Sequence, residues 1–219
     1  MKYRPVYTLF LSVILLTAGL SSCSYKHYKG FEQVSTENTP IPVVYVSSFT
    51  KAVYSTNFKI FGQELSGITM MKKVQSGNTI HVVFMSQIGL KFFDIEIRPE
   101  DKENWFHVNY IMESMNREFI ISMLKTDFML LFGQYPKHSE IAAFRQTGSN
   151  ATETTIRFDK NVASVFSQPT NNQPVKIELR KGCSVKATIQ LTPGNNYPEN
   201  VEINNKRAGL QLEWDEIQM

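Results

Sequence analysis

The chain has 219 residues, two cysteines and a formal net charge of +3, and 42% of its residues are hydrophobic. The positive balance is too small to indicate a nucleic-acid-binding protein. The length fits a single domain, because all-β barrels and sandwiches commonly reach this size as one unit.

The first residues predict export from the cytoplasm. Lys2 and Arg4 precede an apolar run from Val6 to Gly19, the arrangement of a secretory signal peptide. A membrane-spanning helix needs roughly 20 apolar residues, so this run is too short to serve as one. The sequence LSSC at 20–23 resembles the lipobox of bacterial lipoprotein signal peptides, which implies cleavage before Cys23 and lipid modification of that cysteine. The alternative is an ordinary signal peptide with a chance cysteine near its end.

These signals divide the chain into three expected parts. They are a lipoprotein signal peptide at 1–22, a lipidated N-terminus and flexible tether at 23–42, and a single domain at 43–219. Loss of the signal peptide removes two positive charges, which leaves a mature net charge of about +1. Ser24 and Tyr25 follow the cysteine, where aspartate commonly retains lipoproteins at the inner membrane. By that sorting rule we expect a lipid-anchored protein at the periplasmic face of the outer membrane.

Beyond the tether, apolar residues repeat at every second position, which predicts half-buried strands. The first four predicted strands cover 54–62, 64–74, 78–87 and 90–98, and their short connections are typical of an antiparallel meander. Further strands are predicted at 141–147, 152–159, 162–167, 201–207 and 208–217. The clearest pair, at 175–180 and 185–191, flanks Lys181-Gly182 and should form a hairpin.

One segment, between Asn109 and Phe132, does not show this alternation of apolar and polar residues. Its apolar residues fall three and four positions apart, which predicts a helix. Ser114 or Asn116 could cap the start of this helix, and Gly133 marks its end. The whole pattern predicts a mainly β fold, a strongly curved antiparallel sheet of roughly nine to eleven strands whose open side the helix closes as a lid.

Two of the predicted strands are apolar on both faces. In Ile80–Met85 every residue except His81 is apolar. Around 90–97, one face holds Leu90 and Phe92 and the other holds Phe93, Ile95 and Ile97. Either a second layer covers the other face and the core is thick and filled, or the fold encloses an apolar cavity wide enough for a ligand.

Three stretches carry a resemblance to a known family: LSGITMMKKVQSGNTIHVVFMSQIGLKFFDIEI, the helical MNREFIISMLKTDFMLLF, and PVKIELRKGCSVKATIQLTP. Together they resemble the lipoprotein-localisation (LolA/LolB-like) family, and the sequence is most similar to its outer-membrane LolB type. The resemblance covers roughly residues 48–217. It implies an incomplete antiparallel barrel with a helical lid and an apolar cavity for the acyl chains of lipoproteins.

The resemblance also implies site residues. In MSQIGLKFFD, Ile88 matches the apolar residue of a hairpin tip used for membrane insertion, and Leu90 follows it. The alternative is that both side chains fold under the sheet. The expected ligand cavity has Phe84, Phe92 and Ile95 in its wall and Phe119, Met123, Phe128 and Leu131 in its lid. The implied partners are acylated lipoproteins or lipid, a periplasmic carrier protein, and the outer membrane reached through the N-terminal acyl chains.

The sequence gives little support to enzyme chemistry. The four histidines are scattered, and no HExxH, paired-cysteine or GxSxG pattern is present. Asp94 and Glu96 share a strand face, but alternating acidic residues are typical of any solvated face, and catalysis would require His107 to join them in one cleft. We therefore expect a non-enzymatic protein without metal or cofactor. We also expect no internal disulfide at Cys183 if Cys23 is lipidated. The rival hypothesis is a structural accessory lipoprotein of an envelope complex, with a sheet filled by its own side chains.

Overall fold

The computed structural model of the protein describes residues 31–35, 40–45, 48–74, 78–146, 151–207 and 209–218. The predicted signal peptide at 1–22 and Cys23 lie outside these residues. The described strands and helices are β1 (Phe31–Ser35), β2 (Lys51–Ile60), β3 (Gln63–Lys73), β4 (Ile80–Met85), β5 (Lys91–Ile97), β6 (Phe106–Ile111), the 3-10 turn η1 (Glu113–Met115), α2 (Glu118–Phe132), β7 (Glu140–Gln146), β8 (Thr152–Phe158), β9 (Asn161–Ser167), β10 (Pro174–Lys181), β11 (Ser184–Thr192), β12 (Asn200–Asn205) and β13 (Leu210–Glu216).

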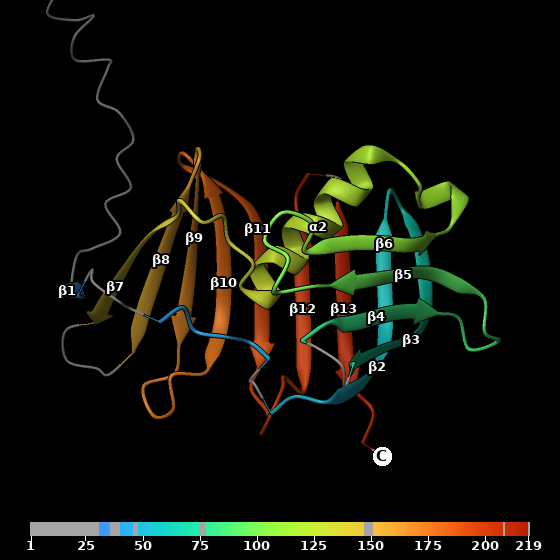
Figure 1. Cartoon of the computed structure of the whole chain (residues 1–219), viewed down its shortest axis with the longest axis horizontal. Coiled ribbons are helices and arrows are strands. Elements are labelled where there is room, and N and C mark those ends of the chain that lie inside the picture. Colours follow the sequence, from blue (N-terminus) through green and yellow to red (C-terminus); the bar gives the residue numbers. More distant parts are fainter. Residues whose placement is uncertain are drawn as a thin grey trace, which may run out of the picture.

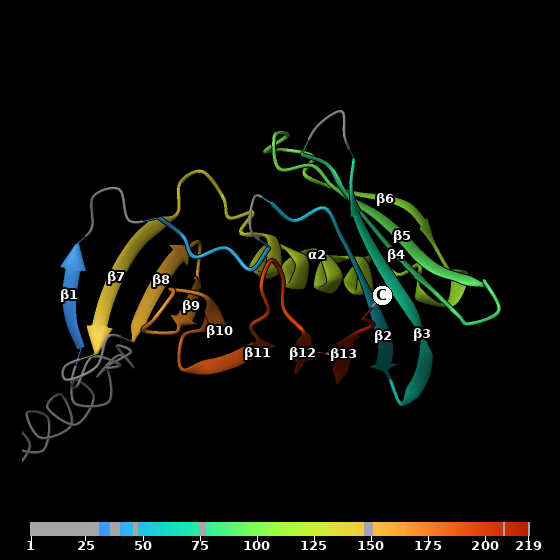
Figure 2. The same ribbon diagram turned by 90° about the horizontal axis from the view of Figure 1, so that it is seen from below.

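All thirteen strands belong to one antiparallel sheet in the order β1-β7-β8-β9-β10-β11-β12-β13-β2-β3-β4-β5-β6. The sheet curls but does not close, and α2 lies across its concave side (Figures 1 and 2). The prediction of a curved antiparallel sheet with a helical lid is therefore confirmed. Two strands more than the expected maximum are present, because the sequence analysis missed β1 and β6.

The alternation that predicted the strands follows their burial. In β2, every second side chain from Ala52 to Ile60 is buried while the intervening ones are mostly exposed. Successive side chains of a strand point to opposite faces, so one set enters the concave side and the other meets solvent. The predicted hairpin is also confirmed, with Lys181 paired to Ser184 across a turn at Gly182.

Strand β4 departs from this rule, because its outward face is also apolar. Val82 and Phe84 are fully buried on the concave side, whereas Val83 and Met85 are half-buried on the outward side. Where β3 passes the end of β4, Gly67 lies so close that a Cβ atom there would overlap the carbonyl oxygen of Met85. The second apolar face of β4 is thus an outer surface of the sheet. The interpretation that this face lines an internal cavity is therefore wrong for β4.

Helix α2 begins later than the sequence predicted. Residues 109–111 belong to β6, and the helix starts at Glu118 after Arg117, whose side chain makes no capping hydrogen bond. The capping role expected for Ser114 or Asn116 was therefore wrong. The end was predicted correctly, because Gly133 adopts a left-handed conformation with φ of 64° and its N–H donates to the carbonyl of Met129.

A strap, residues 40–45, runs over the concave side of the strands around β9 and β10 (Figures 1 and 2). Its Val44 side chain is buried, and Tyr45 stacks on Phe132 at the end of α2 with ring centroids 5.0 Å apart. Strand β1 pairs with β7 and falls within the segment that the sequence analysis assigned to the tether. Ordered structure therefore begins before Val43, the first residue of the expected domain.

None of the described helices is long and apolar enough to cross a membrane.

Candidate functional site

Among the described residues, the most exposed large apolar side chain lies in the connection between β4 and β5. Ile88 is 93% exposed and Leu90 is 53% exposed. The backbone N–H of Ser86 donates to the carbonyl of Leu90 at 2.8 Å, and the N–H of Gly89 donates back to the carbonyl of Ser86 at 2.9 Å. These two bonds close a tight turn, which leaves Ile88 pointing into solvent instead of folding under the sheet.

A second exposed apolar pair, which the sequence analysis missed, joins a turn to the lid helix. Phe61 lies in the two-residue turn between β2 and β3, is 58% exposed, and has a φ of +50°, an unusual value for a bulky side chain. Its ring meets Phe119 at 5.4 Å in an edge-on arrangement, and Phe119 is 39% exposed. Phe119, expected in the lid of a cavity, therefore lies at the surface. In Figure 1 the β2–β3 turn and the start of α2 lie toward the top, whereas the β4–β5 turn projects from the right-hand side.

The other residues expected to line a cavity form a packed core. Phe84 lies 4.7 Å from Phe92 and 5.5 Å from Phe93, measured between ring centroids. Phe128 of α2 lies 6.3 Å from Phe93 and 6.2 Å from Trp214. Aromatic rings at these separations are in direct contact. The remaining predicted residues are also buried, namely Ile95, Met123 and Leu131. The space between α2 and strands β4, β5 and β13 is thus filled by side chains.

A mostly apolar pocket lies at the other end of α2. It has a volume of about 310 Å³. Its walls come from the strap, the end of α2 and the ends of β3 and β4, with lining residues Val43, Tyr45, Phe49, Lys73, Asn78, Ile80, Pro99, Leu131 and Phe132. Of the residues that the sequence placed in a cavity, Leu131 is the one that reaches this pocket. The strap could not be anticipated from its sequence, because it carries no sustained period.

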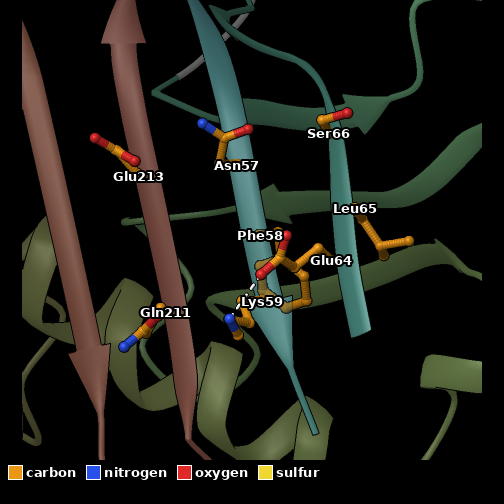
Figure 3. Close-up of a pocket in the computed structure, with 8 residues that line it drawn as sticks. All are labelled: Asn57, Phe58, Lys59, Glu64, Leu65, Ser66, Gln211 and Glu213. Carbon is orange, nitrogen blue, oxygen red and sulfur yellow. Dashed lines mark hydrogen bonds and ion pairs between the residues drawn. The ribbon is translucent and has the colours of Figure 1, made fainter. Parts of the chain in front are cut away.

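A larger groove of about 410 Å³ crosses the outer surface of β13, β2 and β3 (Figure 3). Polar side chains dominate it, including Asn57, Ser66 and Glu213, and Lys59 pairs with Glu64 at 2.6 Å. Such a lining does not suit an acyl chain, because burying polar groups against hydrocarbon leaves their hydrogen bonds unmade. The groove is therefore not the candidate site for an apolar ligand.

One carboxyl group lies in the interior. Asp127 of α2 is 1% exposed, and its Oδ1 accepts a hydrogen bond of 2.9 Å from Nδ2 of Asn205 on β12. Burial raises the pKa of Asp127 to about 7, although the hydrogen bond from Asn205 opposes that shift. The sequence analysis missed this group, although an acidic residue within a largely apolar helix could have indicated a buried carboxyl group at Asp127.

The acidic residues considered for catalysis lie on the open outer face of β5. Asn109 donates to both carboxylates, at 3.2 Å to Asp94 and 3.1 Å to Glu96. Lys91 pairs with Asp94 at 2.8 Å, and Arg98 Nε donates to Glu96 at 2.8 Å. Hydrogen bonding from Arg98 lowers the pKa of Glu96 below its ordinary value.

The third residue of that hypothesis, His107, is the cross-strand partner of Glu96 on β6 and is exposed. The three groups therefore share a charged strand surface. Among the described residues no group of histidine, cysteine, aspartate or glutamate side chains could hold a metal ion.

Cys183 lies in the exposed turn between β10 and β11. The structure has it disulfide-bonded, in contrast to the expectation from the sequence. The chain contains one other cysteine, Cys23, which lies outside the described residues.

No protein-family model and no curated protein matches the chain. Among solved structures, the fold is similar to that of a DUF1329 family protein from Desulfovibrio piger, with 8% sequence identity and a TM-score of 0.44 over 78% of this chain and 85% of that chain. It is also similar to a domain provisionally assigned as an outer membrane lipoprotein-sorting protein from Vibrio parahaemolyticus, with 9% identity and a TM-score of 0.43 over 78% of this chain and 85% of that chain.

Proposed function

We propose that this protein is an envelope lipoprotein that binds an acyl chain of a lipoprotein, or a comparable lipid, and delivers it to the outer membrane. The observation that carries the proposal is the apolar pocket of about 310 Å³ between the strap and the end of α2. Pockets for small ligands in proteins span about 300–1,000 Å³ and are lined mainly by apolar and aromatic side chains. The pocket is at the small end of this range, so it would hold part of an acyl chain.

Transfer from such a pocket to a bilayer requires no energy source. Each methylene group that leaves water for an apolar environment contributes about 0.8 kcal/mol. A small pocket buries only part of a chain, whereas a bilayer buries all of it, so the chain moves downhill into the membrane. Leu131 and Phe132 form one wall of the pocket and belong to α2, so displacement of the helix end would widen it.

Docking to the membrane would use the exposed apolar tip. Ile88 and Leu90 project from the β4–β5 turn, and burial of one such side chain in lipid contributes about 1.5 to 3 kcal/mol. Phe61 and Phe119 are also exposed and would provide a second apolar contact.

The proposal includes the membrane attachment that the sequence implies. Residues 1–22 would be removed as a signal peptide, and acyl chains on Cys23 would hold the domain at the periplasmic face of the outer membrane. Cargo would arrive on a periplasmic carrier protein. The protein would act as a binding and transfer protein, without catalysis.

Binding of a fluorescent long-chain fatty acid to the full-length protein tests the proposal. Val43 is 51% exposed and lines the pocket, so Val43→Glu places a charge in the wall without removing core packing. The matched control is Val34→Glu, because Val34 is 48% exposed on β1 and does not line the pocket. We expect one-to-one binding by the wild-type protein and by Val34→Glu, and at least tenfold weaker binding by Val43→Glu.

The packed interior favours a second candidate, a structural accessory lipoprotein of an envelope complex. The ring contacts between α2 and the sheet leave that region filled, as a purely structural domain requires. Absence of fatty-acid binding by the wild-type protein would select this candidate over the carrier.

A further inference from the structure

The buried contact between Asp127 and Asn205 links the lid helix to the middle of the sheet. Asn205 is itself fully engaged, because its Oδ1 accepts the backbone N–H of Arg207 at 3.1 Å while its Nδ2 donates to Asp127 at 2.9 Å. The side chain of Asn205 therefore cannot rotate without losing a bond. It presents a fixed donor to one oxygen of the carboxyl group.

The other oxygen of Asp127, Oδ2, is buried and has no hydrogen-bond partner among the described residues. A buried polar atom without a partner carries the full cost of leaving water, and an ionised carboxylate carries a far larger one. The contact with Asn205 thus supplies one hydrogen bond to Oδ1 and leaves Oδ2 without one, which is too little to stabilise a buried charged carboxylate.

No cation faces Asp127 from the elements packed around it. Its neighbours one turn away on α2 are Met123, Leu124, Leu130 and Leu131, all buried and apolar. On the sheet, Asn205 pairs with Ala187 of β11 and with Leu210 of β13, both fully buried. Among the described residues no ion pair includes Asp127.

We infer that Asp127 and Asn205 form a proton-controlled latch, which holds α2 on the sheet while the carboxyl group keeps its proton and releases the helix when that proton is lost. The charged form gains its missing hydration only if α2 moves away from β12. Ionisation therefore favours movement of the helix away from β12. The hydrogen bond from Asn205 offsets only part of this effect, and the ring contacts of Phe128 oppose the movement in both protonation states.

The pH range of the latch follows from the two states of the carboxyl group. Burial raises the pKa of Asp127 to about 7 in the closed state, whereas an aspartate in water titrates near 3.9. Between these values the closed state binds one proton more than the open state, so opening becomes about tenfold more favourable for each pH unit. Above pH 7 both states are ionised, and the effect levels off.

The latch lies one helical turn from Leu131, which lines the apolar pocket. Release of α2 would therefore widen that pocket, a consequence that rests on the function proposed above. The latch itself concerns the helix alone and is tested without any ligand.

Hydrogen–deuterium exchange of the α2 amides, measured by mass spectrometry on the full-length protein from pH 5 to pH 8, tests this inference. At each pH the exchange rate of the wild-type protein is divided by the exchange rate of Asp127→Asn. This ratio cancels the intrinsic pH dependence of amide exchange, which both proteins share. We expect the ratio to rise about tenfold per pH unit and to level off near pH 7, a gain of about 100-fold. Asp159→Asn, at an exposed carboxyl group in the turn after β8, serves as the matched control and should exchange like the wild-type protein throughout.

Two further measurements remain decisive if Asp127→Asn does not fold. In the wild-type protein alone, exchange in α2 should rise relative to exchange in β11 over the same pH range. In Asn205→Ala the rise should end at a higher pH, because the lost hydrogen bond favours the charged form of Asp127. A ratio of α2 to β11 exchange that stays constant from pH 5 to pH 8, or an equal rise in Asp127→Asn, would overturn the latch.

Discussion

Replacement of Phe128 by alanine tests whether α2 is part of the core or a loosely placed lid. The ring of Phe128 is fully buried and lies within 6.3 Å of four other aromatic rings, those of Phe93, Phe106, Phe132 and Trp214. Truncation of a buried phenylalanine costs about 3–5 kcal/mol, because transfer energy is lost and a cavity is left behind. We expect a loss of about 4 kcal/mol in the free energy of unfolding.

The assay is urea denaturation of the full-length protein. With a slope of about 2 kcal/mol per molar urea, the midpoint should fall by about 2 M. Phe119→Ala is the matched control, because Phe119 belongs to the same helix but is partly exposed and contacts the ring of Phe61. Its expected cost is about 1 kcal/mol. Equal, small losses for both variants would refute the packing described above and would mean that α2 rests only lightly on the sheet.

Three other outcomes are expected. Ile88→Glu should leave the thermal midpoint unchanged, because Ile88 is exposed, and should abolish delivery of lipoproteins to vesicles; unimpaired delivery would remove the tip from the mechanism. In Arg98→Ala the pKa of Glu96, followed by NMR, should rise toward its ordinary value, since Arg98 stabilises the charged form. The stabilisation that this pair provides is present above pH 4 to 5 and is lost as the pH falls through the lowered pKa, so the variant should lose less stability than the wild type on acidification. One sulfur cannot carry both an acyl thioether and a disulfide, so we expect mass analysis of the mature protein under non-reducing conditions to find Cys23 acylated; an unacylated Cys23 would contradict the proposed lipid anchor.

Period-two patterns predicted most of the sheet because burial on one face imposes them directly. The paired strands β10 and β11 show this, with Ile177 opposite Ile189 and Leu179 opposite Ala187 on the buried side. The same reasoning missed β6, where the register with β5 shifts between Asp94 and Ile95 and breaks the alternation. It also missed β1, an edge strand of five residues that is too short to show a period.

The candidate site was harder to predict, because apolarity does not distinguish a filled core from a cavity. Phe84, Phe92 and Phe128 have the residue types of a ligand wall, yet in the structure they pack against one another and against neighbouring rings. The pocket that does exist depends on the path of the strap, which brings Val43 and Tyr45 over the end of α2. Contacts between segments so distant in the chain are set by the tertiary fold, and no local pattern records them.

Native mass spectrometry of the purified full-length protein, after incubation with a long-chain fatty acid, tests the proposed apolar binding site most directly. We predict one bound fatty acid per chain in the wild-type protein and in Val34→Glu, and at least tenfold weaker binding in Val43→Glu. An unliganded mass for the wild-type protein, under conditions that preserve weak apolar complexes, would contradict the carrier function and would leave the structural accessory lipoprotein as the better explanation.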